Sequence, residues 1–241
     1  MTIYHSAGSS PSWTGQDIGI MVLDCQYPFV RGNVANAQSY QFPVRYAEVK
    51  GASIERLLYE GDASLLGTFV DAARQLQNEG VRAITGACGF MAQFQKELQE
   101  AVGVPVFSSS LLQIPYMYAL TGKPVGVITA DATCLKAAHF RACDVPQELP
   151  VAIAGMDLVA AFKNSVLANA VTLDNDAVKL GAVKTAVQLQ KDNPAIGSIL
   201  LECSDLPPYA KDIQRATGLP VFDFITMIEN VHRAFNPPQF G

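Results

Sequence analysis

Two stretches of the chain repeat one pattern, and this repeat constrains the fold more than any other feature. Each is an apolar run that ends at a cysteine, Cys88 in the first copy and Cys203 in the second. A Pro-Val-Phe sequence follows each cysteine at the same distance, 105 − 88 = 17 residues to Pro105 and 220 − 203 = 17 residues to Pro220. The copies align without a gap at an offset of 203 − 88 = 115 residues. This offset is too long for a solenoid and indicates an internal duplication.

Apolar runs alternate with helical periodicity through both copies. Asp62 and Asp174 precede two matching amphipathic stretches and are predicted to cap helices. The alternation predicts an α/β fold with parallel sheets and right-handed crossovers. The duplication predicts two pseudo-symmetric α/β lobes, with the active site in the cleft between them. The expected strands are 18–23, 45–50, 81–87 and 104–107, then 124–129, 151–154 and 196–201, and the chain is expected to close with a last helix over 221–235.

Composition excludes several classes of function. The net charge is −5 with no basic cluster, so nucleic acid is not an expected partner. No apolar run reaches the roughly 18 residues that span a bilayer, so no membrane association is expected. The segment Met1 to Gly15 is polar and lacks a signal-peptide layout, which predicts a cytoplasmic protein. The spacings of the five cysteines and the three histidines match no metal motif, so no metal is expected.

The two motif cysteines are the first candidates for chemistry. Ligands of parallel α/β sheets bind outside the carboxyl ends of the strands, and both cysteines fall at such ends, just before a predicted helix. A helix N-terminus favours the thiolate and should lower the pKa of the thiol, and its N–H groups can hold a carboxylate. Two lobes that face each other would place Cys88 and Cys203 on opposite sides of one small substrate.

Other polar residues at strand ends have a structural and a functional reading. Asp24 follows the first strand and is either a turn residue or part of the site. Asp131 is predicted to cap the helix that carries Leu135, and Glu202 is interpreted as a solvent-facing or packing residue. Ser109 lies in a serine run at another carboxyl end, so it is a candidate for substrate binding. Cys25, Cys134 and Cys143 are interpreted as small buried apolar residues.

The segment from Tyr27 to Arg45 has neither helical nor strand periodicity. Long irregular segments within compact domains are often lids or binding loops. We therefore expect this segment to close over the substrate and to set specificity.

The two cysteine motifs resemble those of a known family. Thr85-Gly86-Ala87-Cys88-Gly89-Phe90 and Glu202-Cys203-Ser204-Asp205-Leu206-Pro207-Pro208 are similar to the paired motifs of the aspartate/glutamate/hydantoin racemase superfamily. The resemblance covers nearly the whole chain. It is greatest to an uncharacterised Asp/Glu racemase-like branch with a Phe-Pro-Val-Arg-Tyr stretch, here 42–46. These motifs are specific for the superfamily and weak for the substrate.

The resemblance implies a cofactor-independent racemase or epimerase, an isomerase of amino acid metabolism. One cysteine would remove the proton next to a carboxylate or carbonyl of an amino acid such as aspartate or glutamate, or of a hydantoin. The other would return a proton to the opposite face. The implied ligand is a small carboxylate-bearing substrate, and a homo-oligomer is possible. The implied substrate contacts are Gly89, Phe90, Ser204 and Asp205, with Asp24 and Asp131 in the cleft.

The resemblance also implies that the final helix exchanges between the lobes. The expected division is then 1–107 plus 222–241 for lobe one and 108–221 for lobe two. Two departures from the family pattern bear on the reaction. Gly89 stands where many of the amino-acid racemases have Asn or Thr, so that side-chain contact is missing. The chain also has Asp24-Cys25-Gln26 where glutamate racemases have Asp-Ser-Gly, and it lacks their histidine after the second cysteine, which disfavours a glutamate racemase of the peptidoglycan type.

Arylmalonate decarboxylases of the superfamily lack the first cysteine, so the presence of Cys88 favours racemisation or epimerisation. Two alternatives stay open. One is a maleate-type cis-trans isomerase, or a decarboxylase or other lyase, acting on a dicarboxylate. The other is a non-catalytic homologue that binds a small anion.

Overall fold

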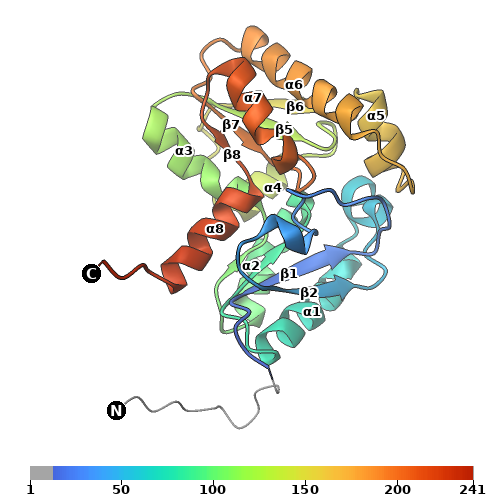
Figure 1. Ribbon diagram of the computed structural model, residues 1–241, viewed down its shortest axis with the longest axis vertical. Coiled ribbons are helices and arrows are strands. Elements are labelled where there is room, and N and C mark those ends of the chain that lie inside the picture. The colour runs from blue at the N-terminus through green and yellow to red at the C-terminus, as the bar shows by residue number, and fades with distance from the viewer. Residues whose placement is uncertain (1–12, 241) are drawn as a thin grey trace.

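The computed structural model describes residues 13–240 and contains two parallel sheets of four strands each. The first sheet has the order β2-β1-β3-β4 and the second the order β6-β5-β7-β8, so the same topology occurs twice (Figure 1). The predicted α/β class and the parallel sheets are confirmed. The strands are β1 (Ile18–Leu23), β2 (Val44–Val49), β3 (Ala83–Gly86), β4 (Val106–Phe107), β5 (Val125–Thr129), β6 (Val151–Gly155), β7 (Ser198–Leu201) and β8 (Val221–Phe222).

Helices connect the strands and cover the sheets, because each sheet is apolar on both faces. Every residue of β3, β5 and β7 is buried, which explains why these strands read as continuous apolar runs. The α-helices are α1 (Leu66–Asn78), α2 (Gln95–Ala101), α3 (Ile114–Thr121), α4 (Ala137–Ala142), α5 (Ala160–Phe162), α6 (Asn175–Asp192), α7 (Ala210–Thr217) and α8 (Phe224–Phe235).

The predicted helix N-caps are confirmed only in part. The Asp174 side chain accepts a hydrogen bond from the Ala177 amide at 3.0 Å and caps α6, as predicted. Asp62 makes the same kind of bond to the Ser64 amide and begins a short 3₁₀ helix, η3 (Ala63–Leu65), that runs into α1. The prediction for Asp131 is wrong. Its carboxylate closes a turn onto Thr133, and α4 begins later, after Lys136.

The segment after Cys88 also differs from the prediction. It begins as a 3₁₀ helix, η4 (Gly89–Phe94), and only then continues as the seven-residue helix α2. After Cys203 a turn, closed by the Leu206 amide on the Cys203 carbonyl at 3.1 Å, precedes the 3₁₀ helix η7 (Pro207–Tyr209) and α7. Pro207 and Pro208 occupy the first turn, where a missing N–H leaves no bond unmade. Neither cysteine therefore lies directly at the start of an α-helix.

The C-terminal helix α8 returns to the first sheet. Phe224, Met227 and Ile228 are buried against β1 residues Ile18 and Ile20, in a cluster that also contains Phe107. In Figure 1 this helix leaves the second sheet and runs alongside the first. This packing supports the predicted division into 1–107 plus 222–241 and 108–221, which stays a prediction.

The segment from Tyr27 to Arg45 is mostly irregular, as expected. It holds one 3₁₀ turn, η1 (Ala37–Ser39), and its end enters β2. The strand β8 (Val221–Phe222) was not predicted, because the last helix was expected to begin at Val221 and α8 begins at Phe224. Two short π-helices were not predicted either, η2 (Glu55–Tyr59) and η6 (Lys163–Leu167). A 3₁₀ helix, η5 (Ser110–Gln113), precedes α3.

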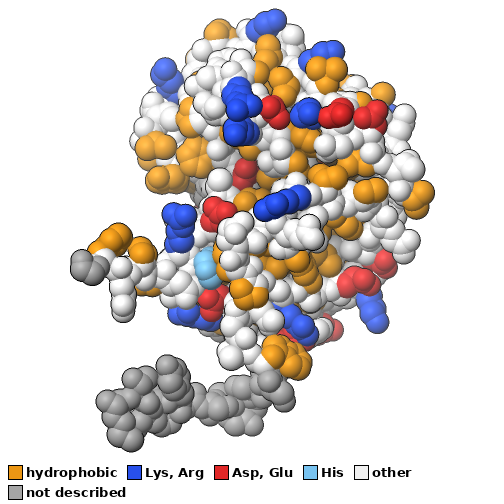
Figure 2. All heavy atoms as spheres, viewed as in Figure 1, with side chains coloured by type: hydrophobic (Ala, Val, Ile, Leu, Met, Phe, Trp, Pro, Cys, Tyr) orange, Lys and Arg blue, Asp and Glu red, His pale blue; other side chains and the backbone are white. Residues whose placement is uncertain are grey.

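In the described part of the chain, no helix is long and apolar enough to cross a membrane, and no cluster of His, Cys, Asp and Glu could hold a metal ion. His5 and most of the Met1 to Gly15 segment lie outside the described residues. On the face in Figure 2, Lys and Arg side chains are scattered among acidic and apolar ones.

Candidate active site

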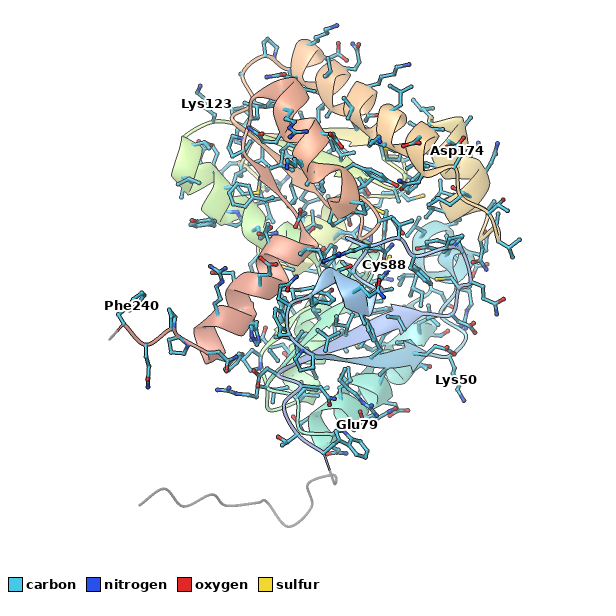
Figure 3. All side chains as sticks on the ribbon, viewed as in Figure 1. Lys50, Glu79, Cys88, Lys123, Asp174 and Phe240 are labelled. Carbon is cyan, nitrogen blue, oxygen red and sulfur yellow. The ribbon has the colours of Figure 1, made fainter. Side chains whose placement is uncertain are left out.

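The two motif cysteines line one cavity between the two sheets. Cys88 lies two residues beyond β3, and Cys203 lies two residues beyond β7, so both stand at carboxyl ends of strands. The backbone just before each cysteine makes the same hydrogen bond in both halves. The Ala87 amide donates to the Met21 carbonyl of β1, and the Glu202 amide donates to the Ile128 carbonyl of β5, both at 2.8 Å. Cys88 appears in Figure 3 where the upper and lower halves meet. The predicted cleft therefore brings both thiols together.

The residue before each cysteine contacts the residue after the other cysteine. Ser204 Oγ donates to the Ala87 carbonyl at 2.8 Å. In the other pair, Glu202 lies against Gly89, where an added Cβ would be 1.9 Å from Glu202 Oε1 and 2.5 Å from the Glu202 carbonyl oxygen. Each half thus completes the surroundings of the other half's cysteine.

Asp205 is a buried carboxyl with three donors. It accepts hydrogen bonds from the Tyr27 hydroxyl at 3.1 Å, Asn33 Nδ2 at 2.5 Å and Cys203 Sγ at 3.4 Å. Burial raises the pKa of Asp205 to about 6, against the effect of these donors. Tyr27 and Asn33 come from the irregular segment of the first half, so this network holds that segment to the second cysteine loop.

Glu202 is a second buried carboxyl, with 0% exposure. Its Oε2 accepts a hydrogen bond from Thr129 Oγ1 at 2.7 Å, while Oε1 is buried without a hydrogen-bond partner among the described residues. Burial raises the pKa of Glu202 to about 7. The interpretation of Glu202 as solvent-facing is wrong, because β7 ends in the interior, beside the cavity, and not at the surface.

The prediction of depressed thiol pKa values is also wrong for this structure. Burial raises the pKa of Cys88 well above its usual value, and the Glu202 charge adds to the effect. Burial does the same to the pKa of Cys203, with Asp205 as the next cause. The amide two residues after each cysteine, at Phe90 and at Asp205, hydrogen-bonds the sulfur and opposes the shift. Both thiols are therefore protonated at neutral pH unless positive charge enters the cavity.

The cavity lining is acidic and aromatic. Its charged side chains are Glu202 and Asp205, and no Lys, Arg or His is among the described residues that line it. Tyr27 and Phe29 form a tilted ring pair with centroids 4.6 Å apart, and both face the cavity with Phe90. Acidic side chains and aromatic faces favour a ligand that carries a cationic group over a ligand that is only anionic.

Segments from both halves cover the cavity. Tyr27 and Phe29 come from the first half, and Val166 and Leu167 of η6 come from the second. The Asn169 side chain accepts a hydrogen bond from the Gln26 amide at 2.7 Å and joins the two segments. The cavity holds about 40 Å³, roughly three times what one water molecule needs. A substrate larger than a few water molecules therefore fits only if the cavity widens.

Six of the nine predicted site residues line the cavity: Cys88, Gly89, Phe90, Cys203, Ser204 and Asp205. Three others do not. Asp24 is exposed and accepts a bond from the Gly51 amide at 3.3 Å. Asp131 closes its turn onto Thr133, and Ser109 caps η5 through the Leu111 amide. Strand ends alone do not bring these side chains to the cavity. The roles of all nine stay predictions.

Several lining residues were missed. Glu202 was visible as an acid directly after an apolar strand, but its contact with Gly89 depends on how the two halves pack. Cys25, interpreted as structural, also lines the cavity. Tyr27 and Phe29 line it too, and Asn33 donates to Asp205 behind it. These residues carry no local pattern, because their place depends on how the irregular segment folds back.

Comparison with known families agrees with this architecture. The profile of the family described as Asp/Glu/Hydantoin racemase matches residues 35–228. The chain belongs to this family. The earlier resemblance on the cysteine motifs is thereby confirmed.

Relatives in the family indicate a different reaction from the one predicted. The chain is 34% identical over 244 residues to dimethylsulfoniopropionate lyase from Durusdinium sp. clade D, covering 97% of this chain and 80% of that one. It is also 34% identical over 242 residues to dimethylsulfoniopropionate lyase 3 from Emiliania huxleyi (strain CCMP1516), covering 93% of this chain. The match spans 61% of the Emiliania protein, less than two thirds of its length.

Solved structures of the family share the fold at low sequence identity. Unliganded arylmalonate decarboxylase has a TM-score of 0.60 at 18% identity, covering 93% of this chain and 94% of that one. A glutamate racemase from Bacillus anthracis has a TM-score of 0.58 at 16% identity, covering 92% and 83%. This family member therefore has the two-sheet architecture of both enzymes.

The predicted racemase or epimerase is contradicted by these relatives, which are lyases. The assignments to the isomerases and to amino acid metabolism are contradicted with it. The error has a physical source. Two cysteines on opposite sides of a substrate suit proton removal and return, but proton removal is equally the first step of an elimination, so retention of Cys88 does not select racemisation.

Proposed function

We propose that this family member is a carbon–sulfur lyase that acts on a small sulfonium carboxylate such as dimethylsulfoniopropionate. The observation that carries the proposal is the charge of the cavity. It is lined by Glu202 and Asp205 and by aromatic rings, without a basic side chain among the described lining residues. A dicarboxylate would bring two more negative charges to this lining. A sulfonium brings one positive charge that the two carboxyls and the aromatic rings can stabilise.

The reaction needs a base at the carbon next to the carboxylate. Once that proton is removed, the electron pair of the broken C–H bond forms the new carbon–carbon double bond. The carbon–sulfur bond breaks on the neighbouring carbon, and its electron pair stays on sulfur. Dimethylsulfoniopropionate then yields acrylate, neutral dimethyl sulfide and a proton held by the base. No oxidant, reductant or second substrate is required.

Cys203 is the base that the geometry favours. Its Sγ lies 3.4 Å from Asp205 Oδ2, within reach for transfer of the thiol proton to that carboxylate. Positive charge from the sulfonium would lower the pKa of the thiol, in opposition to the burial that raises it. Binding of the cationic substrate would thus favour the thiolate form of Cys203 that acts as the base. Cys88 faces the same cavity from the first half and would contact the substrate from the other side.

The substrate carboxylate would bind backbone N–H groups in the two cysteine loops. Gly89 and Ser204 are the residues placed for this, because each follows a cysteine and lines the cavity. An amide donor can hold a carboxylate without a basic side chain.

The test is release of dimethyl sulfide and acrylate from dimethylsulfoniopropionate by the purified chain. Cys203→Ser should lower kcat by about 10³-fold, since a general base contributes roughly 10²–10⁴-fold. Cys88→Ser should also lower activity. Cys134→Ser is the matched control, because Cys134 lies outside the cavity lining and should leave the rate unchanged. Failure of the unmodified chain to release dimethyl sulfide, or full activity of Cys203→Ser, would overturn the proposal.

A further inference from the structure

We propose that Glu202 is the specificity-determining residue that gives this cavity its preference for a cation, and that Gly89 is the residue that admits it. The inference rests on the proposed lyase function and deepens it by naming the charge that the sulfonium would meet. The alternative source of that charge is Asp205, the other carboxyl of the cavity lining.

The hydrogen bonds separate the two carboxyls. Asp205 has donors on both oxygens, from Asn33 on Oδ1 and from Tyr27 and Cys203 on Oδ2. Its negative charge is already shared among them. Glu202 has one donor, Thr129 on Oε2, and its Oε1 is fully buried without one. An uncompensated buried carboxylate oxygen is costly, and a ligand cation is a means of compensating it.

Gly89 makes room for this carboxyl. A Cβ at position 89 would lie 1.9 Å from Glu202 Oε1 and 2.2 Å from Glu202 Cδ. The Glu202 carboxyl therefore occupies the space into which a side chain at 89 would project, directly beside Cys88. An acid here takes the place of any side-chain donor that residue 89 could have offered to an anion, and leaves only the backbone N–H of Gly89 for the substrate carboxylate. The carboxyl of Glu202 adds a negative charge that favours a cation at this side of the cavity.

The experiment is a binding measurement with two ligands of one shape that cannot eliminate dimethyl sulfide. They are 3-(trimethylammonio)propanoate, which carries a cation, and 4,4-dimethylpentanoate, in which carbon replaces the nitrogen. Calorimetry on the whole chain gives the ratio of their two Kd values. In the unmodified protein the cationic ligand should bind at least about tenfold tighter.

Glu202→Gln is the decisive variant, because it keeps the volume and the acceptor for Thr129 but removes the charge. Its ratio should fall about tenfold, through weaker binding of 3-(trimethylammonio)propanoate, while the Kd of 4,4-dimethylpentanoate, whose tail carries no cation, changes less than about threefold. Asp205→Asn is the comparison and should reduce the ratio by less. Thr129→Val leaves Glu202 in place without its one donor, so it favours the neutral carboxyl and should lower the ratio too.

Three results would overturn the assignment: no preference in the unmodified protein, an unchanged ratio in Glu202→Gln, or a ratio that collapses in Asp205→Asn alone. If Glu202→Gln does not fold, the ratio in Thr129→Val decides in the same way. None of these outcomes depends on turnover. If the unmodified protein prefers the cationic ligand but releases no dimethyl sulfide, the lyase proposal is wrong and the cation site stands. If it releases dimethyl sulfide but shows no preference, the lyase proposal stands and the assignment of Glu202 is wrong.

Discussion

At position 89 only a hydrogen atom fits, because both the carboxyl and the backbone carbonyl of Glu202 occupy the space of a Cβ. The backbone part of this contact cannot be relieved by rotating a side chain. Gly89→Ala should therefore shift the two cysteine loops apart and lower stability by about 1–3 kcal/mol, the range for overpacking. Activity should fall with it, since the loops carry both thiols.

A matched glycine provides the control for this substitution. Gly67 lies in α1, and a Cβ there would meet nothing within 4 Å. Gly67→Ala should raise stability by about 0.5–1 kcal/mol, because glycine is a poor helix residue. Chemical denaturation of both variants measures the contrast, and equal stabilities would contradict the proposed contact at Gly89.

Glu202 also makes stability depend on pH. Its pKa is raised from 4.5 to about 7, so the folded protein holds this proton more tightly than the unfolded chain does. The free energy of unfolding should therefore decrease as pH rises from about 4.5 to about 7, as the unfolded chain loses this proton first. Glu202→Gln should flatten this part of the profile. Denaturation at pH 5 and pH 8 tests it: an equally steep profile in the variant would show that Glu202 is not the source.

At the scale of elements, the two covering segments control access to the cavity. Asn169 lies two residues after η6 with φ +49°, and its side chain accepts a hydrogen bond from the Gln26 amide. One residue therefore forms the turn and joins the two covering segments. Asn169→Gly keeps the left-handed turn and removes the hydrogen bond to Gln26. Amides of residues 26–35 should then exchange hydrogen faster, and KM should rise because the covered form is less populated. Asn169→Asp retains an acceptor and should behave as the unmodified chain; equal exchange in all three proteins would exclude a role for this bond.

The same elements show what the sequence could and could not predict. Strands, their parallel order and both cysteines were predictable, because buried runs and a repeated spacing are local signals. The 3₁₀ start after Cys88 was not, since its apolar residues suit either helix type. The place of Tyr27 and Asn33 was not predictable either, because their partner Asp205 lies in the other half. The raised thiol pKa values follow from burial under these covering segments, and no local pattern contains that information.

At the scale of the whole molecule, α8 links the end of the chain to the first sheet. Phe224 is fully buried between this helix and β1, and Phe240 is 91% exposed. Phe224→Ala should lower the free energy of unfolding by about 3–5 kcal/mol through the cavity it leaves. Phe240→Ala removes the same atoms from the surface and should change stability by less than about 0.5 kcal/mol. Similar losses in the two variants would mean that α8 does not hold the first sheet.

The contact between Glu202 and Gly89 has a consequence for the history of the duplication. In the alignment of the copies, Ala87 corresponds to Glu202 and Gly89 to Ser204. An ancestral dimer of identical half-length chains would have had the same two residues at both crossings. The present chain has a large acid facing a glycine at one crossing and an alanine facing a serine at the other. The two crossings therefore differ in size and in charge, and in related sequences a larger residue at position 89 should accompany a smaller one at 202.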